Sequence, residues 1–153
     1  MPSRLRRDVQ MLLMTAARRA ANCAHAPYSG VRVGAAVLTG NDRVFVGCNV
    51  ENASYGLTNC AERVAIQGAV AAGERSVRAV AVFSPDIKGI TPCGACRQVM
   101  AEFSSPAKPG LLIIVEGKKG LETIPLAKLL PRAFVGRPGG KGRFVAPATT
   151  KCL

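Results

Sequence analysis

Two stretches decide the fold: CAERVAIQGAV at residues 60–70 and PCGACRQVMAEF at residues 92–103. In each stretch a cysteine opens a run whose apolar side chains recur at helical spacing. We predict one helix that begins near Cys60 and stops at Gly73, because glycine commonly follows the last turn of a helix. The second helix is predicted to begin at Cys93, since proline is favoured at a helix start.

The rest of the chain predicts further helices and strands around these two. Further helices are predicted over residues 3–22, with Ser3 as a cap, and over residues 125–130. Strands are predicted over residues 31–39, 43–49, 77–83 and 111–115, the first two forming a hairpin through Gly40-Asn41-Asp42. Strands interleaved with helices imply a three-layer α/β/α sandwich with a mixed central sheet of about five strands.

Length and composition indicate one domain that keeps its cysteines reduced. The chain has 153 residues, 48% of them hydrophobic, so it can bury an ordinary core without disulfides. We expect a catalytic domain over residues 1–135 and a flexible, basic, Gly/Pro-rich tail over residues 136–153. No secretory signal or membrane span is evident, and we expect a cytoplasmic protein.

The strongly basic composition raises the question of an anionic partner. The formal net charge is +12, but aromatic residues make up only 5% of the chain and tryptophan is absent. The chain therefore has few aromatic rings that could stack on the bases of a single strand. We expect a basic solvated surface rather than a nucleic-acid-binding protein. The single histidine, His25, also argues against a Cys-His protease or a Ser-His-Asp hydrolase.

Three cysteines at the starts of the two predicted helices form a candidate metal site. Backbone N–H groups and the helix dipole favour thiolates at Cys60, Cys93 and Cys96. Zinc accepts sulfur in a tetrahedron, and three protein ligands leave one position for water. Glu62 lies within reach of that water as a general acid/base. Three thiolates leave zinc with a net negative charge, which Arg63 or Arg97 can offset by bonding a ligand sulfur.

Taken together, these motifs resemble the zinc signature of the cytidine deaminases. The strings are Cys60-Ala61-Glu62-Arg63 and Pro92-Cys93-Gly94-Ala95-Cys96-Arg97-Gln98, with further matches at Tyr28-Ser29, residues 33–36, residues 47–55 and residues 129–131. The likeness covers residues 27–135 in the family's order and is to its short-chain, three-cysteine, homotetrameric branch. It implies zinc-dependent hydrolysis of cytidine or 2′-deoxycytidine in pyrimidine salvage, with Glu62 passing protons.

The resemblance also implies which residues contact the nucleoside. Asn49 and Glu51 would bind the ribose hydroxyls, while Tyr55 and Ala61 would complete the pocket. Phe134 would come from a neighbouring subunit. Val31 departs from the family's pattern, because a phenylalanine that stacks on the pyrimidine usually stands there. Either another ring, such as that of Phe134, covers the base, or the pocket is wider and takes a modified cytosine.

Other interpretations remain open at this point. Cys93 and Cys96 alone fit a redox pair, but that role leaves Cys60 and Glu62 without a task. They also fit part of a structural zinc site, but such a site wants a fourth protein ligand, and His25 is far away in sequence. A deaminase of a bulkier cytosine nucleoside, such as blasticidin S, is the alternative enzyme. A nucleic-acid editing or RNA-binding module is the alternative of another class.

Overall fold

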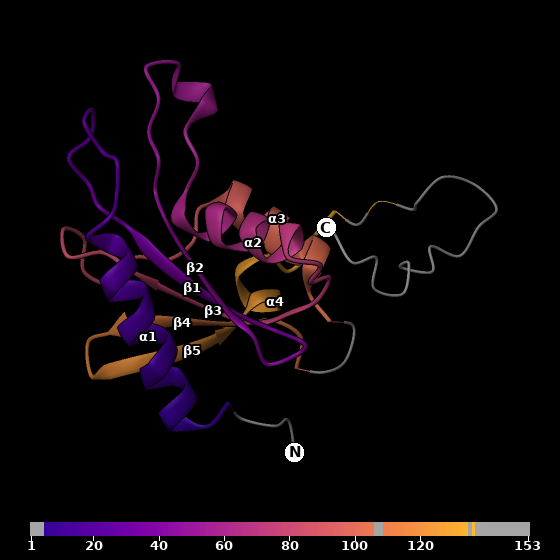
Figure 1. Ribbon diagram of the computed structural model, residues 1–153. Coiled ribbons are helices and arrows are strands. Elements are labelled where there is room, and N and C mark those ends of the chain that lie inside the picture. Colours follow the sequence, from indigo (N-terminus) through magenta and orange to yellow (C-terminus); the bar gives the residue numbers. More distant parts are fainter. Residues whose placement is uncertain (1–4, 106–108, 135, 137–153) are drawn as a thin grey trace.

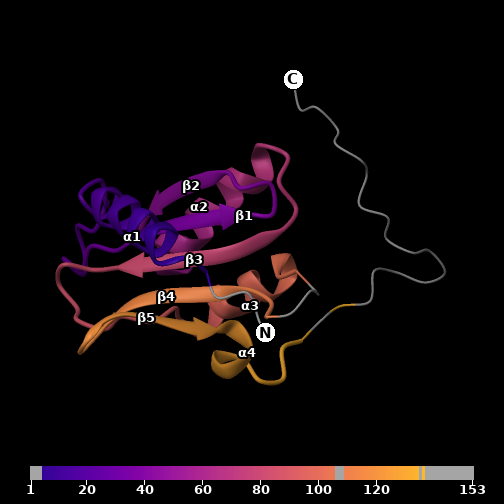
Figure 2. The same cartoon turned by 90° about the horizontal axis from the view of Figure 1, so that it is seen from below.

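A five-stranded mixed sheet is the middle layer of the structure, a computed structural model that describes residues 5–105, 109–134 and 136. The elements are α1 (Arg7–Ala21), β1 (Gly34–Thr39), β2 (Val44–Cys48), a 3-10 helix η1 (Tyr55–Leu57), α2 (Ala61–Ala71), β3 (Val77–Phe83), α3 (Gly94–Phe103), β4 (Leu112–Gly117), β5 (Gly120–Pro125) and α4 (Leu126–Leu129). Figure 2 shows the strands in the spatial order β2-β1-β3-β4-β5. β3 and β4 are parallel, and the other neighbouring pairs are antiparallel.

Helices cover both faces of the sheet, so the predicted three-layer sandwich is confirmed. α1 lies across one face (Figure 1), where Leu13, Met14 and Ala17 pack on Ala36 and Ile114. α2 and α3 cover the other face. All six residues of β1 are buried, as expected for a strand covered on both sides.

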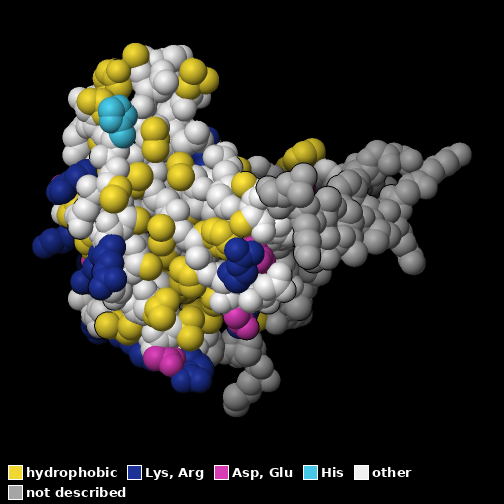
Figure 3. Space-filling model, viewed as in Figure 1, with side chains coloured by type: hydrophobic (Ala, Val, Ile, Leu, Met, Phe, Trp, Pro, Cys, Tyr) yellow, Lys and Arg dark blue, Asp and Glu magenta, His cyan; other side chains and the backbone are white. Residues whose placement is uncertain are grey.

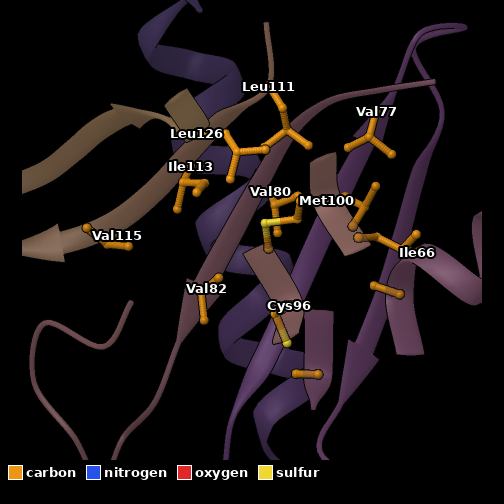
Figure 4. Close-up of a cluster of buried hydrophobic side chains, with 14 residues drawn as sticks. Ile66, Val77, Val80, Val82, Cys96, Met100, Leu111, Ile113, Val115 and Leu126 are labelled. Atoms are coloured by element: carbon orange, nitrogen blue, oxygen red, sulfur yellow. The ribbon is translucent and has the colours of Figure 1, made fainter. Parts of the chain in front are cut away.

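The core beneath α2 and α3 extends directly to the cysteines. Ile66 of α2 and Met100 of α3 pack with Val80 of β3, and none of the three side chains is exposed (Figure 4). Cys96 belongs to the same cluster and is also fully buried. Truncation of a buried methionine in such a core typically costs about 2–5 kcal/mol. The core therefore fixes the helix that carries one of the candidate ligands.

Glycine lets a helix approach the sheet closely at two positions. A Cβ at Gly34 would lie 2.0 Å from the carbonyl oxygen of Ala17 in α1. A Cβ at Gly47 would lie 2.5 Å from the carbonyl oxygen of Ala61 in α2. Both distances are far below van der Waals contact, so the layer spacing at these points requires glycine.

The structure confirms most predicted elements and corrects several boundaries. The hairpin is present, with Asp42 at φ 59° in the left-handed region. Residues 31–33 were predicted as strand but precede β1, and β5 was not located from sequence. The first helix begins at Arg7, and its N-cap residue Arg6 makes no side-chain capping bond. Ser3, the predicted cap, and the tail beyond Gly136 lie outside the described residues. No helix in the described ranges is long and apolar enough to span a bilayer.

Candidate metal centre and active site

The three predicted metal ligands meet where α2 and α3 begin. Cys60 is the N-cap residue of α2, Cys93 is the N-cap residue of α3, and Cys96 lies in the first turn of α3. Their sulfur atoms all lie within 4.8 Å of one another. Neither N-cap thiol caps its own helix. The thiols are therefore directed toward one common point.

The spacing of the sulfurs fits a zinc ion. Zn–S bonds of about 2.3 Å in a tetrahedron place sulfurs about 3.8 Å apart. The Cys60 and Cys93 sulfurs are 3.9 Å apart, close to that value. Cys96 is buried while Cys93 is exposed, so the centre has one side in the core and one side open. An open side is what a catalytic zinc site needs to admit water and substrate.

Hydrogen bonds stabilise a thiolate at Cys60. The bond from the Cys96 thiol, helped by those from Arg63 and Cys93, lowers the pKa of Cys60 to about 5 despite its partial burial. The same interaction with Cys60, together with burial, raises the pKa of Cys96. The protonated thiol of Cys96 thus stabilises the thiolate of Cys60, and the thiolate in turn stabilises the proton on Cys96. A thiolate is the form that binds zinc, so one ligand is already in its metal-binding state.

Glu62 is buried beside this cluster. It lies in the first turn of α2 and is 3% exposed. Burial, together with the charge of Cys60, raises the pKa of Glu62 above the usual range of a glutamate. It also lies within hydrogen-bonding reach of Cys96. A raised pKa makes a carboxyl group better able to hold a proton and pass it on.

The two arginines of the motifs have different partners. Arg63 donates from Nη2 to the Cys60 sulfur at 3.5 Å and to the Thr58 carbonyl oxygen at 3.1 Å. Arg97 donates from Nε to the Pro92 carbonyl oxygen at 2.7 Å and from Nη1 to Leu129 at 3.0 Å. Arg63 therefore bonds the sulfur of a candidate ligand, whereas Arg97 holds the turn that precedes Cys93.

Asn49 and Glu51 both fasten the segment that precedes β1. Asn49 donates from Nδ2 to the Val31 carbonyl oxygen and accepts at Oδ1 from the Val33 amide, each at 2.8 Å. Glu51 accepts at Oε2 from the amides of Tyr28 and Ser29, at 2.8 and 3.2 Å. The hydroxyl of Ser29 donates to Oε1. These bonds, led by that from the hydroxyl, lower the pKa of Glu51.

The other predicted substrate contacts have varied surroundings. Val31 is half-buried, and Ala61 is fully buried at the first position of α2. Tyr55 is exposed in η1 and meets Tyr28 edge-on, with ring centroids 5.9 Å apart. Phe134 is 77% exposed, while its carbonyl oxygen accepts from Gln98 at 2.7 Å. Asn49 and Glu51 thus share the segment of residues 28–33 as a hydrogen-bonding partner, whereas Tyr55 and Phe134 are both exposed to solvent.

Sequence reasoning missed two elements of this framework. Ser29 belongs to the Tyr28-Ser29 match, but nothing in the sequence points to its hydrogen bond with Glu51. Asp86 was not singled out, yet it accepts from the Arg32 amide at 2.8 Å and from the guanidinium of the same residue. No pattern in the sequence links residues 32 and 86, so only the fold reveals that pair.

A wide hollow elsewhere does not contain the predicted metal ligands. It has a volume of about 1620 Å³ and lies against β4, β5 and the start of α1. None of the three cysteines lines it. The cysteine cluster carries the ligand chemistry, so we place the site there.

Fold and site together fit a zinc-binding enzyme, because the cluster of three cysteines is compatible with a zinc ion. Residues 8–108 match the family model described as the cytidine and deoxycytidylate deaminase zinc-binding region, and the chain belongs to this family. A cytidine deaminase of Sporosarcina psychrophila is 44% identical over 127 residues, covering 83% of this chain and 91% of that protein. One from Halalkalibacterium halodurans is 46% identical over 127 residues, with coverage of 83% and 94%.

Solved structures show the same fold. The crystal structure of cytidine deaminase from Burkholderia pseudomallei has a TM-score of 0.72 and 47% identity, covering 81% of this chain and 98% of that one. The crystal structure of cytidine deaminase from Mycobacterium tuberculosis has a TM-score of 0.70 and 39% identity, with coverage of 82% and 96%.

Proposed function

We propose that this chain catalyses the hydrolytic deamination of cytidine or 2′-deoxycytidine, giving the uracil nucleoside and ammonia. The observation that carries the proposal is the buried carboxyl group of Glu62 beside the Cys60 and Cys96 thiols. The relatives named cytidine deaminase support this choice of substrate. The reaction adds water at C4 of the base and removes the amino group, so it needs a group that moves protons.

Glu62 is that group in the proposed mechanism. Zinc, when held by Cys60, Cys93 and Cys96, supplies a Lewis acid that makes a water molecule acidic near neutral pH. Glu62 accepts a proton from the attacking water and delivers it to N3 of the ring. It then takes the second proton from the hydroxyl formed at C4 and delivers it to the amino group, which leaves as ammonia as the C4 carbonyl forms. Burial suits this role, because a raised pKa brings the carboxyl closer to the working pH.

The sugar is held by Asn49 and Glu51 in this proposal. Glu51 already accepts three hydrogen bonds. A carboxylate offers about four acceptor sites, so one remains for a sugar hydroxyl. Asn49 uses one of its two N–H groups on Val31, so one N–H remains for another hydroxyl. Each residue can therefore take one hydroxyl while it still holds the segment before β1.

The base and the remaining walls of the pocket are assigned to Val31, Ala61, Tyr55 and Phe134. Ala61 offers a backbone group at the start of α2. Phe134 is 77% exposed, so its side chain packs little against its own subunit. This exposure supports a role of Phe134 in the pocket of a neighbouring subunit.

The exposure of Phe134 and an exposed apolar surface support a homotetramer with sites shared between subunits. Figure 3 shows hydrophobic side chains gathered on the face that carries α1. Leu12 of α1 and Val46 of β2 are 57% and 55% exposed. A contiguous exposed apolar patch marks a surface that a partner covers, which supports contact between subunits on this face.

The setting of the enzyme is proposed on chemical grounds. Thiolate ligands persist where cysteines stay reduced, so we place the protein in the cytoplasm, where it serves pyrimidine salvage. Residues 1–135 form the catalytic domain in this proposal, since the described site residues all precede residue 135. Residues 136–153 are assigned no part in catalysis.

The decisive experiment compares two glutamate variants of the zinc-loaded protein. Glu62→Gln keeps the shape of the side chain but cannot carry the proton, so turnover of cytidine should fall by about 10²–10⁴ while zinc content is unchanged. Glu102→Gln is the matched control, because Glu102 is exposed on α3 away from the cluster. Ammonia release from cytidine and deoxycytidine measures both. Near-native turnover by Glu62→Gln would refute the proposed mechanism.

A further inference from the structure

The segment from Tyr28 to Val33 joins α1 to β1 without joining the sheet. It is held mainly by side chains from the residues that follow β2. The Asn49 side chain donates a hydrogen bond to the carbonyl oxygen of Val31 and accepts one from the amide of Val33. The Glu51 carboxylate accepts hydrogen bonds from the amides of Tyr28 and Ser29. The proposed sugar-binding residues are therefore also the supports of the segment that carries Val31.

One hydroxyl group connects these two supports. The Ser29 hydroxyl donates to Oε1 of Glu51 and accepts from the backbone amide of Val31 at 3.0 Å. The hydroxyl thus bonds the carboxylate of Glu51, proposed to bind the sugar, and the backbone of Val31, proposed to contact the base. A hydroxyl can donate one hydrogen bond and accept two, so both contacts form together.

We propose that Ser29 is a positioning residue for nucleoside recognition, because its hydroxyl fixes the Glu51 carboxylate and the Val31 backbone relative to one another. The inference rests on the proposed roles of Glu51 and Val31 in binding the nucleoside. Ser29 itself acts through these two residues and has no direct part in the proton transfers.

The two oxygens of Glu51 depend on different donors. Oε2 is held by two backbone amides, which no side-chain substitution at position 29 removes. In the described structure Oε1 has one hydrogen-bond donor, the Ser29 hydroxyl. Oε1 is also the oxygen with an acceptor site left for substrate. Removal of the hydroxyl therefore frees the oxygen that would face the sugar.

The segment keeps its other anchors when the hydroxyl is removed. Asn49 still holds Val31 and Val33 from one side. Asp86 holds the Arg32 amide at 2.8 Å and the Arg32 guanidinium through both carboxylate oxygens. Loss of the hydroxyl should thus alter the alignment of the site without unfolding the segment.

The test is steady-state kinetics of the zinc-loaded protein with Ser29→Ala, Ser29→Thr and the control Ser76→Ala. Ser76 lies beside Gly40, at the opposite end of β1 from Ser29. We expect Ser29→Ala to raise KM for cytidine about tenfold, with kcat within about twofold, as for loss of a hydrogen bond to a charged group. Ser29→Thr keeps the hydroxyl and should restore KM. Ser76→Ala should match the parent protein.

Further measurements separate positioning from general damage and from failure of the sugar assignment. Zinc content should be unchanged in Ser29→Ala, and the variant should still unfold in one cooperative transition. If that variant does not fold, Ser29→Cys keeps the volume with a weak donor and should also raise KM. Glu51→Gln should raise KM by itself, and an unchanged KM there would overturn the sugar role and this inference with it. A raised KM in Glu51→Gln with an unchanged KM in Ser29→Ala would overturn the role of Ser29 alone.

Discussion

Replacement of Gly47 by alanine tests how closely the active-site helix must approach the sheet. Gly47 lies in β2, opposite Ala35 of β1 and beneath α2. An added Cβ would lie 2.5 Å from the Ala61 carbonyl oxygen and 2.5 Å from the Ala65 amide nitrogen. Comfortable contact between such atoms begins at about 3.5 Å, so α2 and β2 must separate by about 1 Å.

That separation has two expected consequences. Overpacking of this kind destabilises a protein by about 1–3 kcal/mol. It also moves the helix start that carries Cys60 and Glu62, and a displacement of about 1 Å in a reacting group can cost about 10²-fold in rate. We therefore expect Gly47→Ala to lose both stability and turnover.

A second glycine provides the matched control. Gly68 lies in the same helix, and an added Cβ there would meet no atom within 4 Å. Alanine inside a helix is favoured over glycine by about 0.5–1 kcal/mol, so Gly68→Ala should stabilise the protein and leave turnover unchanged. Urea unfolding and cytidine turnover measure both variants. A Gly47→Ala protein as stable as Gly68→Ala would refute the close approach of α2 to β2.

Four further results are expected. Cys60→Ala should reduce zinc from about one ion per chain to well below that and abolish turnover, and full occupancy by metal analysis would contradict the ligand assignment. Burial alone would raise the pKa of Glu74, but hydrogen bonds, one of them from Arg43, hold that pKa below its usual value. The stabilisation is thus present above the unfolded-state pKa and is lost as pH falls through the folded-state value, so Glu74→Gln should flatten the acid side of the stability profile in urea titrations at several pH values. Val31→Phe should lower KM for cytidine by about tenfold if a ring there stacks on the base, and an unchanged KM would place residue 31 outside the base pocket. Deletion of residues 136–153 should leave nucleoside turnover intact, and efficient deamination of a C-containing oligonucleotide that depends on this tail would instead favour an editing enzyme.

The helices that carry the cysteines could be predicted because their signals are local. Pro92 before Cys93 and the apolar spacing after Cys60 act within a few residues, and both cysteines proved to be N-cap residues. The hairpin through Asp42 was equally local. The convergence of the thiols was a hypothesis from their places at two helix starts, and the resemblance supported it. The fold brings the sulfurs of Cys60 and Cys93 to 3.9 Å from one another.

Other features depended on contacts that sequence does not encode locally. The run Gly120–Pro125 lacks a strong strand pattern, yet it forms β5 because β4 offers it an antiparallel partner. Residues 31–33 have strand-like composition. However, the Val31 carbonyl oxygen and the Val33 amide form hydrogen bonds with the Asn49 side chain and not with the backbone of a neighbouring strand. In both cases tertiary hydrogen bonding decided the backbone conformation and local propensity did not.

The two arginines of the motifs show how similar local signals acquire different roles. Arg63 stands three residues after the N-cap cysteine of its helix, a spacing that returns the side chain to the same face and brings its guanidinium to the Cys60 sulfur. Arg97 stands four residues after its own N-cap cysteine, and its guanidinium extends past Cys93 to the Pro92 carbonyl oxygen and across to α4. A positive charge on a ligand sulfur offsets the net negative charge of a three-thiolate zinc centre, whereas a positive charge on backbone carbonyls fixes the turn. Loss of the Arg63 side chain should therefore change the electrostatics of the metal centre, and loss of the Arg97 side chain should change the position of Cys93.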